Sequence, residues 1–438
     1  MQNYILSRFL YFFKKGNKLI VYSCKTCEIA ELDLNNTSSK VMDIEYRTAN
    51  FINDLKNPLQ VIHNNSIFVS NTLDEIDLEQ KKYLNTINSN KSIVFGITPT
   101  MKCNYSCTYC FQKNIKEKNH MTAKTQSELI NFYKEHIKNT EDIHIEWFGG
   151  EPLTGFSILI NLSNSFIDIA VQCDKKYSAS IITNGHLLSK KKIDSFNKLR
   201  INKIQVTLDG LPTTFAKRKS ISLINANHHY EHIFNMLFLM LEKSINVYLR
   251  INVDRRNAHE LYWIIDELQK RGLKYTNLKL GLGWIKGDNT LADCLDQEIL
   301  TTSEFEMLEN EFILYCLNSG FTTDIKPSLI DYPCIAVKSN SYMIDSDGDI
   351  YKCAPLTGLK ENSIGNVNNF ENIRKVSDSN WYIKFDPYEN LNCKNCEFIP
   401  ICMGACPRMH NQEYQKECPL KRRFKNRINR YYDNMMHM

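Results

Sequence analysis

The middle of the chain alternates between apolar, strand-like runs and amphipathic, helix-like stretches, and this alternation limits the folds open to it. Six runs have the composition of buried strands: residues 92–98, 143–148, 179–184, 203–209, 247–253 and 277–283. Helix-like stretches such as 124–138 and 259–272 lie between most of them. Because strands that alternate with helices form parallel sheets, we predict an α/β fold with six strand–helix units, arranged as a partial (β/α)6 TIM-like barrel open on one side.

Polar turns follow three of these predicted strands. Gly149-Gly150-Glu151-Pro152 follows the second strand, Thr183-Asn184-Gly185 ends the third, and Asp209-Gly210 ends the fourth. Barrels of this kind carry their chemistry at the carboxyl ends of the strands. We therefore expect a site where these turns meet.

The composition of the whole chain narrows the class of partner. Its 438 residues suffice for two or three domains, and 43% hydrophobic with 24% charged residues is typical of a globular enzyme. The net charge is only +5 and the Lys and Arg residues are scattered, which argues against a nucleic-acid partner. No apolar run reaches transmembrane length and the N-terminus lacks a signal-peptide pattern, so we expect no membrane partner and a cytoplasmic location.

The fifteen cysteines are clustered, which in a reducing compartment indicates metal binding. Cys103, Cys107 and Cys110 lie directly after the first predicted strand, in CNYSCTYCF. A 4Fe-4S cluster takes one ligand per iron, so three thiolates leave one iron open to a substrate or cofactor. A zinc ion with three protein ligands is the competing hypothesis, although no H-x-E segment beside the cysteines supplies a base.

The spacing C-x3-C-x2-C after the first strand, with an aromatic residue before the last cysteine, resembles the radical S-adenosylmethionine (SAM) superfamily. The resemblance covers about residues 92–290 and implies that Gly149, Gly150, Glu151 and Pro152 receive the amino group of SAM through their backbone. It implies further contacts with the carboxylate and ribose from Thr183, Asn184, Thr207 and Asp209. Arg218, in the segment FAKRK, is interpreted as the carboxylate-binding arginine of an HDxxR-type segment.

This resemblance implies a reaction but no catalytic side chain. One electron from the cluster would cleave the sulfonium, and the resulting 5′-deoxyadenosyl radical would remove hydrogen from an unactivated carbon. The cofactor supplies the difficult chemistry, while the protein positions the target C–H bond. Arg250 and Asn252 on the fifth strand are further candidates for cofactor contacts, whereas Trp147 and Phe148 are interpreted as core residues.

The last quarter of the chain resembles the seven-cysteine SPASM domain, which holds two auxiliary 4Fe-4S clusters. The resemblance assigns Cys393, Cys396, Cys402 and Cys418 to one cluster, and Cys334, Cys353 and Cys406 to the other. The fourth ligand of the latter is open: Cys316 is far upstream, Asp331 offers an oxygen, and an open iron is a third option. With the N-terminal cluster this makes three, although a zinc ribbon at 393–418 is the alternative.

The first ninety residues predict a small α+β domain. Residues 18–23 and 28–34 form strands of a hairpin, followed by a helix-like segment at 44–55 and a short strand at 66–70. Peptide maturases often carry such a domain to pair with a leader peptide. Cys24 and Cys27, in the hairpin turn, are interpreted as a surface pair without metal. We thus predict four domains: 1–90 for leader recognition, 91–290 for the barrel, 291–330 as a helical bridge and 331–438 for auxiliary clusters.

The leading functional hypothesis is a peptide maturase that crosslinks side chains of a ribosomally made precursor through a carbon–carbon, ether or thioether bond. Its partners would be the precursor's leader and core, and a flavodoxin- or ferredoxin-type reductant. Alternatives are a sulfatase-type maturase, against which Ala354 after Cys353 argues because such enzymes typically carry aspartate there, and a peptide epimerase. An electron-transfer protein is the non-enzymatic alternative. The precursor, the bond formed and the oligomeric state are not readable from the chain.

Overall fold

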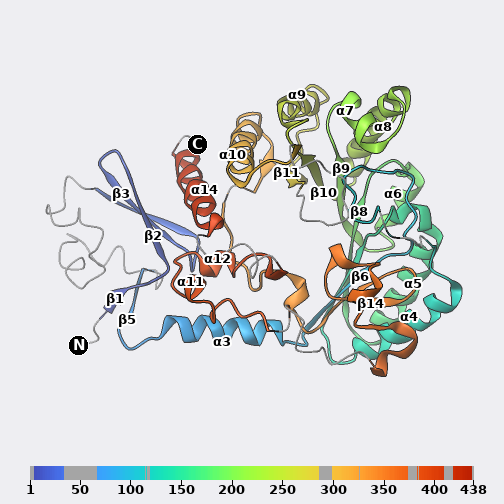
Figure 1. The fold of residues 1–438 in the computed structure, drawn as a ribbon, viewed down its shortest axis with the longest axis horizontal. Coiled ribbons are helices and arrows are strands. Elements are labelled where there is room, and N and C mark those ends of the chain that lie inside the picture. Colours follow the sequence, from blue (N-terminus) through green and yellow to red (C-terminus); the bar gives the residue numbers. More distant parts are fainter. Residues whose placement is uncertain are drawn as a thin grey trace. The chain divides into compact units, whose positions relative to one another are not determined.

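The computed structural model describes most of the chain in two compact units (Figure 1). The described residues are 4–33, 67–113, 115, 119–285, 298–324, 326–372, 382, 384–408 and 418–436. The first unit comprises residues 1–88, 325–338 and 380–438, and the second comprises 89–324 and 339–379. The four domain boundaries drawn from the sequence stay a prediction, and the predicted helical segment at 44–55 lies outside the described residues.

The second unit is built on a parallel sheet whose six central strands follow each other in sequence order. These strands are β6 (Ser92–Ile97), β7 (Asp142–Trp147), β8 (Lys176–Thr183), β9 (Ile201–Leu208), β10 (Asn246–Val253) and β11 (Leu278–Trp284). All five neighbouring pairs are parallel. The α/β class with a mostly parallel sheet is therefore confirmed, in the strand order expected of the predicted partial barrel.

Helices connect these strands and lie around the outside of the sheet (Figure 1). They are α4 (Ala123–His136), α5 (Phe156–Gln172), α6 (Lys190–Phe196), α7 (Pro212–Lys219), α8 (Leu223–Glu242), α9 (Leu261–Lys270) and, after β11, α10 (Thr302–Asn318). Strand β7 shows why: its alternate residues Ile143, Ile145 and Trp147 are buried toward the helices. The residues between them face the opposite side of the sheet. The turns that carry the predicted site follow the carboxyl ends of the strands.

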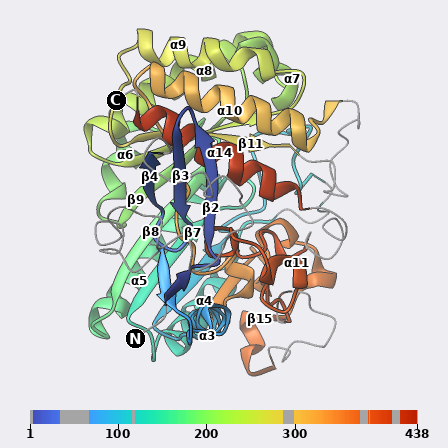
Figure 2. The same ribbon diagram turned by 90° about the vertical axis from the view of Figure 1, so that its left-hand side faces the viewer.

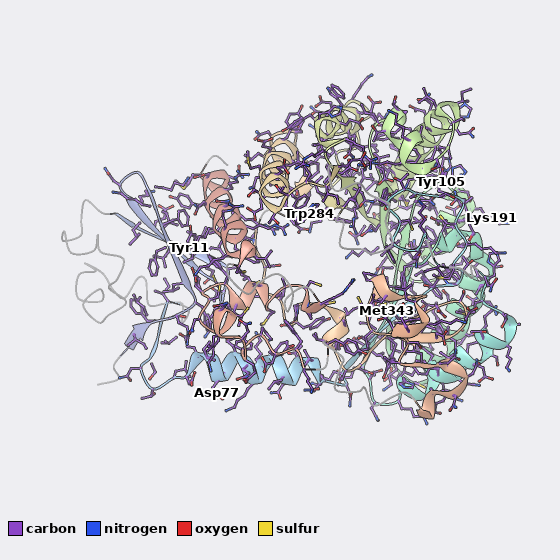
Figure 3. All side chains as sticks on the ribbon, viewed as in Figure 1. Tyr11, Asp77, Tyr105, Lys191, Trp284 and Met343 are labelled. Carbon is purple, nitrogen blue, oxygen red and sulfur yellow. The ribbon has the colours of Figure 1, made fainter. Side chains whose placement is uncertain are left out.

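The sheet continues beyond the six strands on both sides. Strand β12 (Thr322–Thr323) pairs with β11, and β13 (Ser341–Ile344) pairs in parallel with β6. The antiparallel strands β14 (Asp349–Tyr351) and β15 (Gly365–Asn366) complete that edge. Figure 3 marks Met343 on β13, whose side chain is fully buried. Part of the segment predicted to carry auxiliary clusters therefore extends the barrel sheet.

The first unit packs the N-terminal strands against C-terminal helices. It contains β1 (Tyr4–Leu6), β2 (Leu10–Lys15), β3 (Lys18–Ser23), β4 (Glu28–Asp33), β5 (Phe68–Ser70), α3 (Glu75–Ile87), α11 (Leu391–Lys394), α12 (Ile399–Cys402) and α14 (Pro419–Met435). Strands β2, β3 and β4 form an antiparallel sheet beside α14 (Figure 2). Phe13 meets Tyr432 edge-on at 5.7 Å between ring centroids, and Lys15 binds Asp433 at 2.7 Å. The two ends of the chain thus share one core.

The hairpin of β3 and β4 confirms the predicted strand pair but corrects the interpretation of its turn. Cys24 and Cys27 are 0% and 5% exposed, so they are not a surface pair. The turn folds inward because the Cys24 amide donates to the Phe9 carbonyl at 2.9 Å and Lys25 binds Glu75 at 3.3 Å. The sequence did not indicate that Cys24 and Cys27 are buried, because the residues SCKT are typical of an exposed turn.

One helix among the described residues, Pro152–Gln172, is long and apolar enough to cross a membrane by length and composition alone. Here it covers the sheet, with Leu159, Leu162 and Phe166 buried. Phe166 stacks on Tyr133 at 4.3 Å between ring centroids and lies parallel to Trp147 at 6.4 Å. Its apolar face therefore belongs to the core of this unit.

Replacing Phe166 with alanine is expected to lower the free energy of unfolding by about 3–5 kcal/mol, because it leaves a cavity between Tyr133 and Trp147. On the same helix Val171 is 59% exposed, so Val171→Ala should change it by no more than about 0.5 kcal/mol. Urea unfolding followed by circular dichroism measures both. Equal effects of the two substitutions would contradict the packing described for α5.

Candidate functional site

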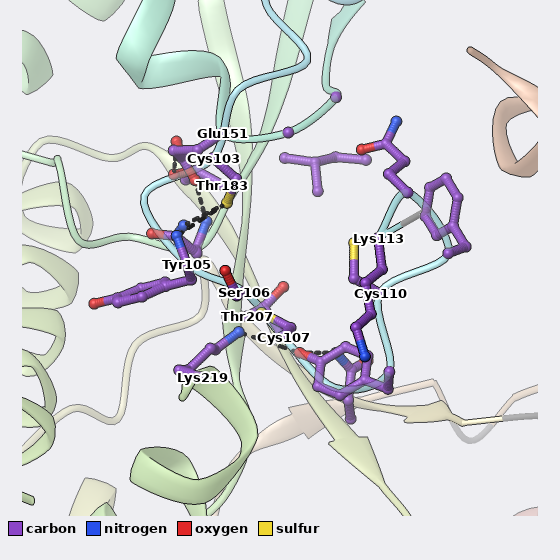
Figure 4. Close-up of a pocket in the computed structure, with 18 of the residues that line it drawn as sticks. Cys103, Tyr105, Ser106, Cys107, Cys110, Lys113, Glu151, Thr183, Thr207 and Lys219 are labelled. Carbon is purple, nitrogen blue, oxygen red and sulfur yellow. Dashed lines mark hydrogen bonds between the residues drawn. The ribbon is translucent and has the colours of Figure 1, made fainter. Parts of the chain in front are cut away.

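The three-cysteine loop follows β6 and borders a cavity of about 410 Å3 at the carboxyl ends of the strands (Figure 4). Cys103, Cys107 and Cys110 all line this cavity. Short backbone contacts fold the loop: the Cys110 amide donates to the Cys107 carbonyl at 3.2 Å, and the Tyr105 amide approaches the Cys103 sulfur at 3.5 Å. The structure thus places the three thiols on one loop beside the cavity.

Burial and the neighbouring thiols of the loop raise the pKa of Cys103 and of Cys107. Burial raises the pKa of Cys107 to about 11. Asp209 and the other two thiols add to this rise, and the Lys219 cation opposes it. Burial also raises the pKa of Cys103, with a contribution from Cys110. Thiols must lose their protons to bind iron, so a group that resists ionisation by itself gains stability when a metal centre compensates its charge.

This donor set fits an iron–sulfur cluster held by three thiolates. Among the described residues, no group of three or more His, Cys, Asp or Glu side chains is close enough together to hold a single metal ion. A 4Fe-4S cluster takes one thiolate on each iron, so its ligands are spread more widely than those of a single ion. The residues present therefore fit the group that the resemblance implies.

The Gly149-Gly150 turn brings the end of β7 into contact with the cysteine loop. Gly149 has φ +121°, a conformation open to glycine, and a Cβ there would lie 2.3 Å from Thr98 Cγ2. A Cβ on Gly150 would lie 2.3 Å from the carbonyl oxygen of Lys102. The Glu151 amide in turn donates to that carbonyl at 2.9 Å. Glycine is needed at both positions because the turn packs so closely against the cysteine loop and the end of β6 that a Cβ does not fit.

Glu151 links this turn to the turn after β8. Its buried carboxylate accepts hydrogen bonds from the Thr183 hydroxyl at 2.7 Å, the Asn184 amide at 2.8 Å and the Leu153 amide at 3.1 Å. Burial raises the pKa of Glu151, while these bonds and Lys219 oppose the rise. Asn184 then donates through its side chain to Asn104 at 2.9 Å, inside the cysteine loop. Glu151 is thus an anchor for the turns that line the cavity.

Asp209 and Lys219 form a buried ion pair beneath the cysteine loop, with 2.5 Å between Lys219 Nζ and Asp209 Oδ2. The Tyr109 hydroxyl donates to the same oxygen at 2.5 Å, and Asn252 Nδ2 donates to the other at 3.1 Å. Burial by itself would raise the pKa of Asp209, but Lys219, Arg218 and these hydrogen bonds hold it below its ordinary value. Asp209 is therefore anionic, and it fixes Tyr109 between Cys107 and Cys110.

Arg218 does not line the cavity, contrary to what a carboxylate-binding role requires, whereas the next residue, Lys219, does. The Arg218 guanidinium is buried in an ion pair with Asp254 at 2.5 Å and donates to the carbonyl of Asn252 at 2.7 Å. On helix α7 two successive side chains point in different directions, so a shift of one residue changes the role. FAKRK offers three cations in sequence, and only packing distinguishes them.

Lys219 retains a donor for a ligand. Two of its three N–H groups are directed at Asp209 and at the Tyr109 hydroxyl, 3.1 Å away. Burial would lower the pKa of Lys219, but Asp209 and Tyr109 hold it well above the ordinary value, so the ammonium stays charged. Figure 4 shows it directed toward the loop that carries Cys107.

The sequence predicted only some of the other residues that line the cavity. Thr183, Asn184 and Thr207 line it as predicted contacts would, and so do Arg250 and Asn252. Arg250 Nε is buried without a hydrogen-bond partner among the described residues. Trp284 and Ile285, at the end of β11, add an apolar wall that no motif indicated.

A tyrosine–histidine chain behind the loop was also missed. The Tyr105 hydroxyl lies 2.9 Å from His186 Nδ1, which lies 2.9 Å from His229 Nδ1. Burial, together with the neighbouring histidines and Lys219, lowers the pKa of His229 to about 3, so it stays neutral. The three residues lie in distant segments, and no pattern in the sequence connects them.

In the first unit, four C-terminal thiols come together as the sequence predicts for one auxiliary cluster. Burial raises the pKa of Cys402 to about 12, and Cys418, Cys396 and Cys393 add to it. The pKa of Cys393 rises to about 12 for the same reasons, with Cys418 and Cys396 as neighbours. Short helices set the spacing: α11 carries Cys393, α12 ends at Cys402, and Cys418 precedes α14.

The other predicted set is divided between the units. Cys334 and Cys406 belong to the first unit, whereas Cys353 belongs to the second. Cys334 and Cys353 each cap a short 3-10 helix. Of the candidates for the open ligand position, Cys316 is fully buried on α10 and Asp331 is exposed.

Residues 97–276 match the profile of the Radical SAM superfamily. The chain therefore carries a radical SAM domain, and it is an enzyme whose cofactors are S-adenosylmethionine and an iron–sulfur cluster.

Two curated relatives cover most of the chain. It is 22% identical over 365 residues to the radical SAM cyclopropyl synthase TigE of Paramaledivibacter caminithermalis, covering 77% of this chain and 72% of TigE. It is 20% identical over 347 residues to the cysteine-type anaerobic sulfatase-maturating enzyme of Clostridium perfringens, covering 73% and 89%.

Two solved structures share the fold. Streptococcus suis SuiB superposes with a TM-score of 0.53 at 16% identity, covering 95% of this chain and 97% of SuiB. Native anSMEcpe with bound AdoMet superposes with a TM-score of 0.56 at 14% identity, covering 78% of this chain and 98% of that one.

Gly150→Ala is expected to weaken SAM binding at least about tenfold, because the new Cβ would push the Lys102 carbonyl and the cysteine loop away from the turn. Gly155→Ala is the matched control: its Cβ would meet Thr100 Cγ2 at 3.3 Å, a flexible contact, and binding should stay within about twofold. Isothermal titration under anaerobic conditions measures both. Wild-type affinity in Gly150→Ala would contradict the close approach described here.

Proposed function

We propose that this enzyme is a peptide maturase that uses SAM to form an intramolecular crosslink in a ribosomally made precursor. The observation that carries the proposal is the joining, in one cavity, of the three-thiol loop, the Gly149-Gly150 turn and the Lys219 cation. A second group of four thiols at Cys393–Cys418 supports an accompanying electron-transfer centre.

In this proposal the chain's own residues hold the cofactors. Cys103, Cys107 and Cys110 hold the N-terminal 4Fe-4S cluster, and the SAM contacts come from Gly149, Gly150, Glu151, Pro152, Thr183, Asn184 and Thr207. Lys219, rather than Arg218, takes the SAM carboxylate, because Lys219 lines the cavity and directs two of its three N–H groups at protein partners, while the Arg218 guanidinium lies outside the cavity lining and is held by Asp254 and Asn252. Asp209 and Arg218 act by positioning Tyr109, Lys219 and Asn252.

When bound and reduced, the cluster supplies the electron that cleaves SAM to a hydrogen-abstracting adenosyl radical. The remaining tasks fall to the cavity wall. Trp284 and Ile285 exclude water from the reacting carbon, since a radical of this kind attacks any accessible C–H bond. Arg250, on β10 beside Thr207 of β9, adds positive charge to the same wall.

Three 4Fe-4S clusters complete the proposal. Cys393, Cys396, Cys402 and Cys418 hold one auxiliary cluster, and Cys334, Cys353 and Cys406 hold the other, whose fourth ligand we leave open. A cluster held by these thiols would supply an acceptor for the electron released when the peptide radical closes a new bond. A flavodoxin- or ferredoxin-type reductant in the cytoplasm supplies the electrons for SAM cleavage.

Relatives support a peptide as the substrate. One solved structure holds SuiB with the precursor peptide SuiA, and another holds anSMEcpe with the Cp18Cys peptide. The antiparallel sheet of β2, β3 and β4 offers edge strands that an extended leader segment can extend. We therefore assign leader recognition to the first unit and core-peptide chemistry to the cavity of the second.

A sulfatase-type maturase is the second candidate, favoured by the Clostridium perfringens relative, which covers 73% of this chain. Ala354, directly after Cys353, opposes it, because the sequence lacks the acidic residue typical at that position. A peptide epimerase is the third candidate. The mass of the product separates all three.

Anaerobically reconstituted enzyme, mixed with SAM and dithionite, is expected to produce 5′-deoxyadenosine, detected by chromatography. Coexpression with a short open reading frame next to the gene should give a peptide 2 Da lighter per crosslink. Unchanged mass would favour epimerisation, and formylglycine in place of Cys or Ser would favour the sulfatase-type reaction. Cys107→Ala removes one cluster ligand and is the negative control. Absence of 5′-deoxyadenosine from cluster-loaded enzyme would contradict radical chemistry.

Lys219→Gln is expected to weaken SAM binding about tenfold or more, since a neutral amide can neither neutralise the carboxylate nor pair with the buried Asp209 that orders the cysteine loop. Arg218→Gln should mainly destabilise the fold, because it removes one of the two arginines, Arg218 and Arg256, that pair with the buried Asp254, while SAM affinity of the folded fraction stays within about threefold. Lys219→Arg keeps the charge and should restore most of the affinity. Binding is measured by titration and folding by circular dichroism; equal affinity losses in both Gln variants would contradict the assignment.

A further inference from the structure

Strand β11 carries glycine at two alternate positions, Gly281 and Gly283. A Cβ on Gly281 would overlap the Tyr248 hydroxyl. A Cβ on Gly283 would overlap Arg250 Nε and Asn252 Oδ1, and it would lie 2.8 Å from Arg250 Nη2. Glycine inside a strand often marks a place where another group approaches closely. Here the approaching groups are side chains of β10, which lie across the backbone of β11.

The Arg250 guanidinium lines the cavity without an acceptor. Its Nε is buried and has no hydrogen-bond partner, and no hydrogen bond or ion pair joins its side chain to another residue in the described part of the chain. A guanidinium stays charged and carries five N–H donors, so leaving it unpaired in a partly buried place is costly. Glu151 is the only carboxylate among the described residues that line the cavity, and it is already bonded to Thr183 and Asn184.

Asn252 separates Arg250 from the place assigned to the SAM carboxylate. The Asn252 Nδ2 donates to the Tyr109 hydroxyl at 3.2 Å, and Lys219 contacts the same hydroxyl at 3.1 Å. The Asn252 Oδ1 lies instead at Gly283, where Arg250 Nε also lies. Lys219 therefore serves the side of the cysteine loop, which SAM has to reach, whereas Arg250 serves the side of β11.

Trp284 gives the β11 side of the cavity a fixed apolar surface. It follows Gly283 directly and lines the cavity together with Ile285. Its ring stacks on Phe305 of α10 at 4.9 Å between centroids, and its Nε1 donates to the Leu300 carbonyl at 3.1 Å. These two contacts hold the ring in place. A cation beside a fixed apolar surface suits a ligand that carries an acceptor group next to an apolar one.

We propose that Arg250 binds a carboxylate of the precursor's core peptide and so positions the neighbouring side chain for hydrogen abstraction. This inference rests on the proposed function, which makes a peptide the substrate. The carboxylate belongs to an Asp or Glu side chain or to the C-terminus of the peptide, and a planar guanidinium binds either one through two parallel hydrogen bonds. The apolar group beside it packs against Trp284. Arg250 thus contacts the peptide, whereas the sequence made it a candidate for a cofactor contact.

The proposed reaction needs such an anchor. An adenosyl radical attacks any accessible C–H bond, so the choice of carbon depends on how the peptide is held. A charge-assisted hydrogen bond in a place with little water fixes the register of a peptide more firmly than apolar contacts alone. Arg250 provides it without giving up a bond within the described part of the protein.

The test measures how tightly the cluster-loaded, SAM-bound full chain binds a core peptide. The peptide is taken from the short reading frame next to the gene, labelled with fluorescein at its N-terminus and followed by fluorescence anisotropy. Arg250→Gln should raise its Kd at least about tenfold. Arg250→Lys, which keeps the charge but loses the planar fork, should raise it about threefold. The SAM affinity of both variants should stay within about twofold of the wild type.

Lys203→Gln is the matched control. It removes a cation from the neighbouring strand β9, at a position paired with Asn246 of β10 and outside the cavity lining. Neither peptide nor SAM affinity should change by more than about twofold. Circular dichroism should show wild-type folding for the Arg250 variants, because that side chain has no bond to another described residue to lose.

Peptide variants locate the carboxylate. Each Asp or Glu of the core is changed in turn to Asn or Gln, and one further peptide carries a C-terminal amide. One of these changes should weaken binding to the wild type about tenfold but binding to Arg250→Gln by no more than about twofold, because the two groups act as a pair. A side-chain change that does so identifies Asp or Glu, and the amide identifies the C-terminus.

Wild-type binding that no loss of a peptide carboxylate weakens would overturn the proposal, as would losses that multiply when the peptide and Arg250 are both changed. A tenfold loss of SAM affinity in Arg250→Gln would also overturn it, because Arg250 would then bind the cofactor. Arg250→Lys supplies the second variant for these comparisons if the Gln variant does not fold. Failure of the proposed function is seen separately, as wild-type enzyme that forms neither 5′-deoxyadenosine nor a lighter peptide.

Discussion

The buried ion pair of Asp209 and Lys219 is the interaction on which the arrangement of the site depends. It joins the end of β9 to the end of α7, and through Tyr109 and Asn252 it reaches the cysteine loop and β10. Burying two charges is expensive unless their remaining hydrogen-bonding capacity is satisfied. Here Tyr109 and Asn252 donate to the two carboxylate oxygens of Asp209, and Lys219 directs two of its three N–H groups at Asp209 and Tyr109, so the pair holds four chain segments in one geometry.

Glu151 plays a comparable part on the opposite side of the cavity. Its carboxylate gathers three hydrogen bonds from the segments after β7 and β8. Glu151 and Asp209 both lie in turns where cofactor contacts were predicted, yet the carboxylates of both bind other groups of the protein. Besides Glu151 and apolar side chains such as Trp284 and Ile285, the cavity is lined by three thiols, neutral donors and cations, a surrounding that favours an anionic cluster and a carboxylate-bearing cofactor.

Much of this was accessible from the sequence. The six strands were predicted within three residues at each end, because buried parallel strands are near-continuous apolar runs. The cysteine loop and the turns at Gly149 and Thr183 follow from strand ends in a parallel sheet. The burial of Arg218 outside the cavity lining did not, because neighbouring positions on a helix differ by about 100° and FAKRK contains cations on several faces. The burial of Cys24 and Cys27 was hidden because it depends on Phe9 and Glu75, from other elements.

The shared core of the first unit has a consequence for dissecting the enzyme. The described N-terminal strands belong to one compact unit with the C-terminal helices, and Phe13 and Lys15 contact the helix that begins directly after Cys418. A deletion of the N-terminal strands, made to test leader recognition, would also remove residues of the unit that contains the C-terminal thiols. A loss of turnover in such a truncated chain would then be explained by damaged electron transfer as well as by lost leader recognition. Single substitutions along the edge of the β2–β4 sheet separate the two effects better.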